Sequence, residues 1–243
     1  MLKIAIIIPC YNESASIAKV LEEIYQLKPA DEYQLVPIAV NDCSTDHTLE
    51  ILQRSGVIYL DLPVNLGIGG TVHTGFKYAL GHNFDIAIQL DGDGQHPVHE
   101  IPDLIAPILA GNSDVTIGSR FIRNKGYQST YLRRSGIAYF KGLNKILTGL
   151  IISDTTSGFR ALNKQALSVA CDYYPDEYPE PEALILYAMN RLRITEVPVE
   201  MRERQGGSSS IHSYKSIYYM AKVSLAVIFL YLRLKFYGKR DPL

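Results

Sequence analysis

The stretch IAIIIPCYNE at residues 4–13 decides the fold that we expect for this chain. Its first half is an almost unbroken aliphatic run that ends at Pro9, and polar side chains follow at once. A strand that is apolar on both faces is typical of a parallel sheet covered by helices on both sides. Such sheets bind ligands beyond the carboxyl ends of their strands, so the polar residues after this run are candidates for a ligand site.

The same pairing of a short apolar run with a longer segment of helical period recurs along the first half of the chain. Strands are predicted at residues 4–9, 35–41, 57–60, 85–90 and 114–118. Helices are predicted between them at residues 14–27, 45–54, 68–81 and 99–111. Alternating strands and helices are the signature of βαβ units. The sequence therefore predicts an α/β fold, Rossmann-like, with a mostly parallel sheet flanked by helices.

The second half has a less regular pattern, with helices predicted at about residues 136–150 and 181–191, a loop at 153–160 and a strand at 194–199. The chain ends with an apolar, aromatic-rich helix predicted at residues 217–232 and a basic tail.

This last predicted helix is short for a membrane span. Its sixteen residues would reach roughly 24 Å at about 1.5 Å each, less than the ~30 Å hydrocarbon layer. Lying at a membrane interface, or docking on a small membrane-protein partner, fits the segment better than crossing, and a buried C-terminal helix is the alternative. We therefore expect a main domain at residues 1–213 and a membrane-interfacial or partner-docking helix with a basic tail at residues 214–243.

Length and composition indicate one ordinary globular domain with an appendage. The 243 residues are 47% hydrophobic and 20% charged, which allows a sizeable core and excludes disordered or collagen-like chains. The three cysteines are widely spaced and odd in number, so they form neither a disulfide framework nor a zinc pattern. Because the apolar run near the N-terminus is too short for a signal peptide, we expect the protein in the cytoplasm.

The net charge of −1 hides a segregation of charges along the chain. Residues 1–114 hold 5 basic and 15 acidic side chains, whereas residues 115–153 hold 7 basic and no acidic ones. A cationic stretch without anions suits the binding of phosphate groups, and a solvated basic face is the alternative. The acidic first half disfavours a long polyanion, so we expect no nucleic-acid partner.

Asp91-Gly92-Asp93 follows the strongest central strand and places two carboxylates one residue apart. Carboxylates this close repel each other unless a cation lies between them, and hard ions such as Mg²⁺ or Mn²⁺ prefer carboxylates together with ligand phosphates. Gln95 adds a neutral oxygen. The sequence therefore predicts metal ligands at Asp91, Asp93 and Gln95. His96 and His99 are near, but this segment lacks the third clustered His or Cys that a zinc site would need.

Asp42 follows the second predicted strand, where a carboxylate can accept hydrogen bonds from a nucleobase or a ribose. A cap of the next helix is the alternative role. The glycine-rich turn at residues 65–70 has neither a dinucleotide fingerprint nor a P-loop, and it follows the third strand instead of the first. A Rossmann dehydrogenase and a P-loop kinase are therefore disfavoured.

Seven motifs, in this order, closely resemble those of family 2 glycosyltransferases. They are IIPCYNE at 7–13, VNDCSTD at 40–46, NLGIGG at 65–70, LDGDGQHP at 90–97, GSR at 118–120, TSGFRA at 156–161 and RQGGSS at 204–209. The resemblance covers about residues 3–215. Its nearest branch resembles the dolichol- or polyprenyl-phosphate sugar synthases and related bacterial cell-envelope enzymes.

The resemblance implies a GT-A fold, a nucleotide-diphosphate sugar donor, a divalent metal and inversion at the anomeric carbon. By motif position, the residues that would hold the nucleotide sugar are Pro9, Tyr11, Asn12, Glu13, Asp42, Gly69, Asp91 and Gly92. The arginines that would meet donor or acceptor phosphates are Arg120, Arg133, Arg134 and Arg204. Asp154 falls where the family has an active-site acid before its Ser-Gly-Phe motif.

Two features depart from the family pattern. The usual pair of acids after the second strand is Asn41-Asp42 here, so one potential contact to the nucleobase is neutral. The C-terminal sequence also lacks the clear pairs of transmembrane helices that many polyprenyl-phosphate synthases carry, which bears on membrane attachment and on the lipid acceptor.

We therefore expect a metal-dependent inverting glycosyltransferase, peripheral on the inner face of the plasma membrane, that moves a sugar onto a polyprenyl phosphate. A phosphate monoester has a second pKa of about 6 and is already ionised near neutral pH, so it needs no general base. The main alternative is transfer to a hydroxyl of a growing cell-envelope polysaccharide, which needs one. A non-catalytic donor-binding scaffold is a third hypothesis, and the sequence leaves open a homo-oligomer.

Overall fold

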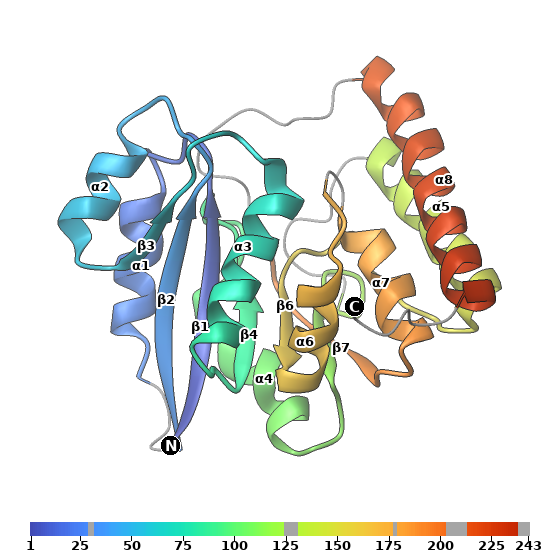
Figure 1. Ribbon diagram of the computed structural model, residues 1–243, viewed down its shortest axis with the longest axis horizontal. Helices are drawn as coiled ribbons and strands as arrows, with labels where there is room; N and C mark the ends of the chain where they lie inside the picture. The colour runs from blue at the N-terminus through green and yellow to red at the C-terminus, as the bar shows by residue number, and fades with distance from the viewer. Residues whose placement is uncertain (29–31, 124–130, 177–178, 203–212, 238–243) are drawn as a thin grey trace.

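The computed structural model of the chain describes residues 1–28, 32–123, 131–176, 179–202 and 213–237. Within these residues a seven-stranded sheet is packed between helices (Figure 1). The strands are β1 (Leu2–Cys10), β2 (Tyr33–Asn41), β3 (Ile58–Asp61), β4 (Ile86–Gln89), β5 (Val115–Ser119), β6 (Arg160–Asn163) and β7 (Ile194–Pro198). The helices are α1 (Ile17–Gln26), α2 (Thr48–Ser55), α3 (Gly67–Gly81), the short 3-10 turn η1 (Val98–Glu100), α4 (Ile101–Leu109), α5 (Tyr131–Thr148), α6 (Lys164–Asp172), α7 (Pro179–Met189) and α8 (Ser213–Tyr237).

The strands lie in the order β3-β2-β1-β4-β6-β5-β7. The strands β1 to β4 run parallel, as do β5 and β7, whereas β6 pairs antiparallel with both β4 and β5. The predicted α/β fold with a mostly parallel sheet is therefore confirmed. The reversed strand β6 and the helix α6 after it are absent from the prediction, because β6 is only four residues long and has apolar side chains at just its two central positions.

The strand β1 is the centre of the core because both of its faces are covered. Ile4, Ile6 and Ile8 pack in the cluster that includes α1 and α4, while Ala5 and Ile7 pack in the cluster that includes α3. All five side chains are completely buried. The aliphatic run predicted as a doubly covered strand therefore buries its apolar surface on both faces of the sheet, which stabilises the fold.

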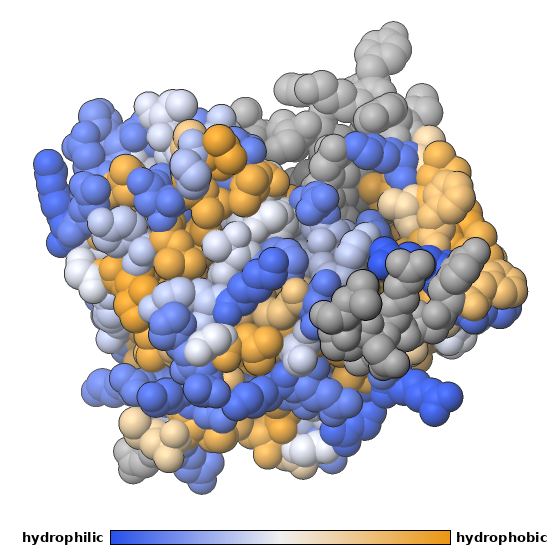
Figure 2. All heavy atoms as spheres, viewed as in Figure 1, coloured by the Kyte–Doolittle hydropathy of each residue, from blue (hydrophilic) through white to orange (hydrophobic). Residues whose placement is uncertain are grey.

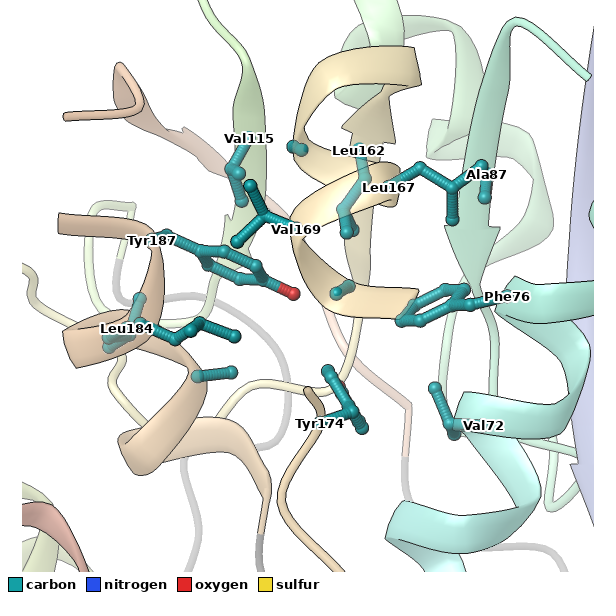
Figure 3. Packing of buried hydrophobic residues seen from close by; sticks show 14 of the residues in the cluster. Val72, Phe76, Ala87, Val115, Leu162, Leu167, Val169, Tyr174, Leu184 and Tyr187 are labelled. Atoms are coloured by element: carbon teal, nitrogen blue, oxygen red, sulfur yellow. The ribbon is translucent and has the colours of Figure 1, made fainter. Parts of the chain in front are cut away.

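A second core layer joins α3 to the C-terminal half of the molecule. The ring of Phe76 in α3 meets the ring of Tyr174 edge to face, with their centroids 5.3 Å apart. Figure 3 shows these two rings in the same cluster as Leu162 of β6, Leu167 of α6 and Tyr187 of α7. This packing fixes α6 and α7 against the sheet, and so it fixes the chain segments that lead into and out of β6.

The C-terminal helix α8 packs along α5 and α7 (Figure 1). Val223, Val227 and Leu230 are buried in the main core cluster, and the hydroxyls of Tyr139 and Ser224 lie 3.0 Å apart. One face of the predicted C-terminal helix is therefore part of the domain core. In the described part of the chain, no helix has both the length and the apolar character needed to cross a bilayer.

Candidate active site

Three turns meet beyond the carboxyl ends of β1, β2 and β4. Cys10 pairs with Asn41 in the sheet, so the segments after these two residues start side by side. The turn after β4 packs against the turn after β1: a Cβ placed on Gly92 would lie 3.1 Å from the Pro9 carbonyl oxygen and 3.6 Å from Cγ of Glu13. The fold thus brings Pro9, Glu13 and Gly92, which are far apart in the sequence, into one place.

Asn12 ties the turn after β1 to the turn after β2. It adopts a positive φ of 57° and accepts a 2.8 Å hydrogen bond from the Thr45 backbone N–H through its side-chain oxygen. The Asn12 backbone N–H donates to the Ser44 hydroxyl at 3.0 Å, and that of Glu13 donates to Thr48 at 2.8 Å. These bonds leave the neighbouring Tyr11 half exposed at the surface of the site.

Asp42 is buried, and its carboxylate holds the glycine-rich turn that starts α3. Its Oδ1 accepts from the Leu66 backbone N–H at 2.6 Å, and its Oδ2 accepts from the Gly67 N–H at 3.0 Å. Asp42 does not take the alternative role, a cap of the next helix, because the N-cap of α2 is His47 and the carboxylate that accepts from the Thr48 N–H, at 2.9 Å, is that of Asp46. Asp42 therefore shapes the start of α3 from the end of β2.

Gly69 is a point of close backbone approach. Its N–H donates to the Asp176 carbonyl oxygen at 2.7 Å, and a Cβ there would lie 2.0 Å from the Pro175 carbonyl oxygen. A side chain at this position is incompatible with that packing. Gly69 thus joins the start of α3 to the segment before α7, a long-range contact that its place in a glycine-rich motif does not reveal.

The turn after β4 is ordered by its own side chains. Asp93 is buried and accepts from the Gln95 backbone N–H at 2.9 Å. The Asp91 N–H donates to Nδ1 of His96 at 2.9 Å, which leaves the proton of a neutral imidazole on Nε2, 3.5 Å from Oδ2 of Asp91. The His96 ring also stacks on Phe159. His96 therefore lies beside the Asp91 carboxylate and orients it. The sequence pattern does not show this role.

Asp154 and Arg120 form a closed ion pair. Asp154 is 0% exposed, its Oδ2 accepts from Nε of Arg120 at 2.7 Å, and its Oδ1 accepts from Nη2 at 2.7 Å. The Glu196 carboxylate on β7 fixes the loop by accepting the N–H groups of Ser153 and Asp154 at 2.7 and 2.8 Å. Such a two-point contact sets the plane of the guanidinium, so Asp154 orients Arg120.

The other predicted arginines are not part of this contact. Arg134 is exposed near the start of α5. Arg133 lies in the first turn of that helix, and its side chain falls outside the described part of the molecule, as does the whole of Arg204. Of the predicted catalytic residues, the structure therefore brings together Asp154 and Arg120.

Glu180 and Arg160 are additions to the predicted set. Glu180 lies in the first turn of α7, where burial raises the pKa of its carboxyl group. The charges of Arg160 and Arg120 oppose that rise and the charge of Asp91 adds to it, so this carboxyl lies within electrostatic reach of the candidate site. The only sequence signal is an acid between two prolines, YPEPE at residues 178–182, which by itself indicates a helix start.

The described site thus unites the turns after β1, β2 and β4, the two acids Asp91 and Asp93, and an arginine oriented by Asp154. Such an edge of an α/β sheet is where ligands bind. Residues 5–169 match the family described as Glycosyl transferase family 2, and the chain belongs to that family. It is a family 2 glycosyltransferase.

Named relatives agree with this assignment, and a solved structure agrees with the fold. The chain is 31% identical to a UDP-N-acetylglucosamine–dolichyl-phosphate N-acetylglucosaminyltransferase of Methanococcus voltae, over 81% of this chain and 84% of that protein. It is 26% identical to an undecaprenyl-phosphate mannosyltransferase of Micrococcus luteus, over 86% and 88%. A glucosyl-3-phosphoglycerate synthase from Mycobacterium tuberculosis, solved with Mn²⁺, UDP-glucose and phosphoglyceric acid, superposes with a TM-score of 0.72 at 19% identity, over 99% and 81%. The last likeness shows the GT-A fold.

Proposed function

We propose that this glycosyltransferase moves a sugar from a nucleotide-diphosphate donor to a polyprenyl phosphate, with inversion and with a divalent metal, at the cytoplasmic face of a membrane. The names of the Methanococcus and Micrococcus relatives, which act on dolichyl and undecaprenyl phosphates, support the acceptor class. The observation that carries the proposal is an exposed apolar and basic surface on α5 and α8, because a lipid acceptor has to be met at a bilayer.

This surface, which we call the α5/α8 face, lies opposite the buried side of α8. Leu225, Phe229, Leu232 and Phe236 are exposed and recur every three or four residues, so they line one side of the helix. Ile146, 82% exposed, extends the apolar surface onto α5. Figure 2 shows apolar side chains gathered over the part of the surface that α8 forms.

Charge complements the apolar rows. Neither α5 nor α8 contains an Asp or a Glu, while Lys141, Lys145, Arg233 and Lys235 lie on these helices. An apolar face flanked by cations is the pattern of helices that lie in the interface of an anionic bilayer. The face therefore suits peripheral attachment, and its cations suit the phosphate of a lipid head group.

The residues at the β4 turn fit a divalent metal. Asp91, Asp93 and Gln95 supply hard oxygen atoms, and backbone lies close to them, since a Cβ on Gly158 would come within 3.5 Å of the Asp91 carboxylate. The described residues contain no cluster of three or more His, Cys, Asp or Glu side chains arranged around one ion. When bound, the ion would neutralise the diphosphate that leaves the sugar.

The chain's own residues perform the remaining tasks of this mechanism. Arg120, held in one orientation by Asp154, donates hydrogen bonds toward phosphate oxygens and stabilises the charge that grows on them during transfer. The turns around Pro9 and Asp42 fix the nucleoside part, so that the sugar is aligned for direct displacement. A single displacement inverts the anomeric carbon. Because both Asp154 oxygens contact Arg120, this acid is an orienting group and not a free proton acceptor.

One observation favours a second candidate function, transfer to a hydroxyl. The raised pKa of the Glu180 carboxyl makes it a better proton acceptor than an ordinary surface acid, and a hydroxyl acceptor needs such a base. In this alternative the base is Glu180, and Asp154 keeps its orienting role.

The two acceptor classes separate in one experiment. The protein is incubated with radiolabelled UDP-, GDP- or dTDP-sugars and either a polyprenyl phosphate or the free polyprenol, followed by solvent extraction. We expect lipid-linked product from the phosphate alone, and we expect Glu180→Gln to retain at least about a tenth of the wild-type rate, since no base is needed. Product from the alcohol that disappears in Glu180→Gln would instead establish the hydroxyl acceptor.

A further inference from the structure

Arg160 is the largest of the fully buried side chains, with 1% of its surface exposed. It is the first residue of β6 and pairs with Gln89, which ends β4 two residues before Asp91. A guanidinium in such a position is costly to desolvate unless its N–H groups are bonded. Its hydrogen bonds therefore indicate why the fold keeps this charged side chain buried beside the candidate site.

The bonds of Arg160 reach two separate segments of backbone. Its Nε donates to the Ser157 carbonyl oxygen at 2.7 Å, and its Nη2 donates to the carbonyl oxygens of Thr155 at 3.3 Å and Glu180 at 2.9 Å. The first two acceptors belong to the turn before β6, and the third belongs to the first turn of α7. One planar group thus fastens this turn to the start of a helix twenty residues further along the chain.

Both fastened segments carry groups of the active site. The turn holds Asp154, which orients Arg120, at one end and Gly158 at the other. A Cβ on Gly158 would lie 2.9 Å from Nε2 of Gln89 and 3.5 Å from Oδ1 of Asp91, so this backbone rests on the acid proposed to bind metal. A shift of the turn would therefore move the oriented arginine and the surroundings of the metal-binding acid together.

We propose that Arg160 is a positioning residue for sugar transfer. By fixing the turn at residues 154–158 against α7, it sets the spacing between the arginine that meets the donor phosphates and the acid that holds the metal. The proposal rests on the proposed function for the reaction that it supports. It assigns Arg160 no contact with substrate, so donor binding through the turns after β1 and β2 stays intact when Arg160 is changed.

The test compares two arginines that each join separate segments of the chain in different places. Arg160→Lys keeps the positive charge but cannot bridge the two segments through Nε and Nη2. Arg193→Lys is the control, since Arg193 forms a two-point contact with the Asp114 carboxylate at the amino ends of β5 and β7, far from the candidate site. Donor KM, kcat and melting temperature are measured for both variants. Manganese affinity is measured without donor, from the paramagnetic resonance of free Mn²⁺.

For Arg160→Lys we expect kcat to fall by about 100-fold with little change in donor KM, because a displacement of about 1 Å at a reacting group has that effect. We also expect Mn²⁺ affinity to fall by about tenfold, the usual cost of disturbing groups behind a metal ligand. Arg193→Lys should retain wild-type kcat and Mn²⁺ affinity. Equal kcat and equal Mn²⁺ affinity in the two variants would overturn the proposal.

Gly158→Ala provides a second, independent test of the proposal. It leaves Arg160 in place but pushes the same turn away from Asp91, so the double variant with Arg160→Lys should be hardly worse than the worse single variant. Strictly additive losses of kcat would show that the two substitutions do not act through the same displacement of the turn. If Arg160→Lys does not fold, Gly158→Ala alone decides, and unchanged Mn²⁺ affinity would overturn the proposal. The Mn²⁺ measurement needs no acceptor, so it separates this proposal from a failure of the polyprenyl-phosphate assignment.

Discussion

The two halves of the sheet, β1 to β4 and β5 to β7, hold their polar groups by different means. In the half formed by β1 to β4, carboxylates accept hydrogen bonds from nearby backbone N–H groups. Asp42 accepts from Leu66 and Gly67, and Asp93 accepts from Gln95. Backbone donors do not depend on the side chain that carries them, and they keep their protons at every relevant pH. This half is therefore a scaffold with fixed geometry.

The other half, from β5 to β7, relies on arginine forks. Arg120 donates hydrogen bonds to Asp154, Arg193 donates to Asp114, and Arg160 donates to backbone carbonyl oxygens. Each fork depends on one planar group, and two of them also depend on an ionised carboxylate. The comparison teaches that the β1 to β4 half holds its carboxylates with backbone donors, which no side-chain substitution removes, whereas the β5 to β7 half depends on guanidinium groups that a single substitution removes.

The largest loss of activity is expected from substitution of a proposed metal ligand in the β1 to β4 half. Asp91→Ala should lower transfer at least about 100-fold, and excess EDTA should abolish it until Mg²⁺ or Mn²⁺ is restored. Asp85→Asn is the control, because Asp85 lies at the other end of the same strand and accepts a hydrogen bond from the Lys3 backbone N–H. Initial rates of lipid-linked product measure both variants. Full activity in EDTA would exclude the metal from the reaction.

A somewhat smaller effect is expected from the fork half. Asp154→Asn should lower kcat by about 30-fold, since a charged two-point contact is replaced by a neutral one, and transfer should remain measurable. Arg120→Lys breaks the same fork, so the two losses should not add in the double variant. Rates from a four-protein cycle give the coupling. Independent, additive losses would show that Asp154 acts without Arg120.

Acid should weaken the ion pair between Arg193 and Asp114. Hydrogen bonds from Arg193 hold the pKa of Asp114 at about 2, below its ordinary value of 3.8. The resulting stability, about 2 kcal/mol, is present above pH 4 and is lost as the pH falls toward 2. We therefore expect Asp114→Asn to unfold more easily in urea than wild type at pH 7, and the difference to shrink between pH 4 and pH 2. A difference independent of pH would contradict this ionic account.

The smallest effect concerns the α5/α8 face, whose side chains are exposed. Phe229→Ser should lower binding to anionic lipid vesicles by about fivefold, because part of an aromatic side chain no longer enters the interface. Its free energy of unfolding should change by less than about 0.5 kcal/mol. Val227→Ser, at a buried position two residues away, should show the reverse pattern. Vesicle sedimentation and urea titration separate the two outcomes, and unchanged sedimentation of Phe229→Ser would argue against lipid contact.

The strands of the scaffold half could be predicted from sequence because burial on both faces produces unmistakable aliphatic runs such as residues 4–8. The turn with Asp91 and Asp93 could also be placed, since residues after buried strands share one edge of the sheet. By contrast, β6 begins with Arg160 and ends with Asn163, so its pairing depends on neighbours that sequence does not display.

Partners of the site residues were less predictable than their positions. The position of Asp42 at the end of a strand could be predicted. Its hydrogen bonds to Leu66 and Gly67 could not, because they depend on the course of a turn more than twenty residues further along the chain. Glu180 carries no spacing signal at all, because its environment is assembled from arginines on two other segments. The local sequence pattern predicts which residues lie at the carboxyl ends of the strands. Long-range packing determines the hydrogen-bond partners of each one.

The reversed direction of β6 makes the chain between β5 and β6 a single excursion from the sheet. Ser119 ends β5 and Arg160 begins β6, and the Gly118 N–H bonds to the Phe159 carbonyl oxygen at 2.8 Å, so the chain leaves and re-enters the sheet at adjoining points. Everything between them, including α5 and Asp154, is one continuous insertion between neighbouring strands. Recombination or grafting between relatives therefore has two backbone junctions to match, together with the packing of α5 on α7 and α8 and the hydrogen bonds of the loop to Glu196.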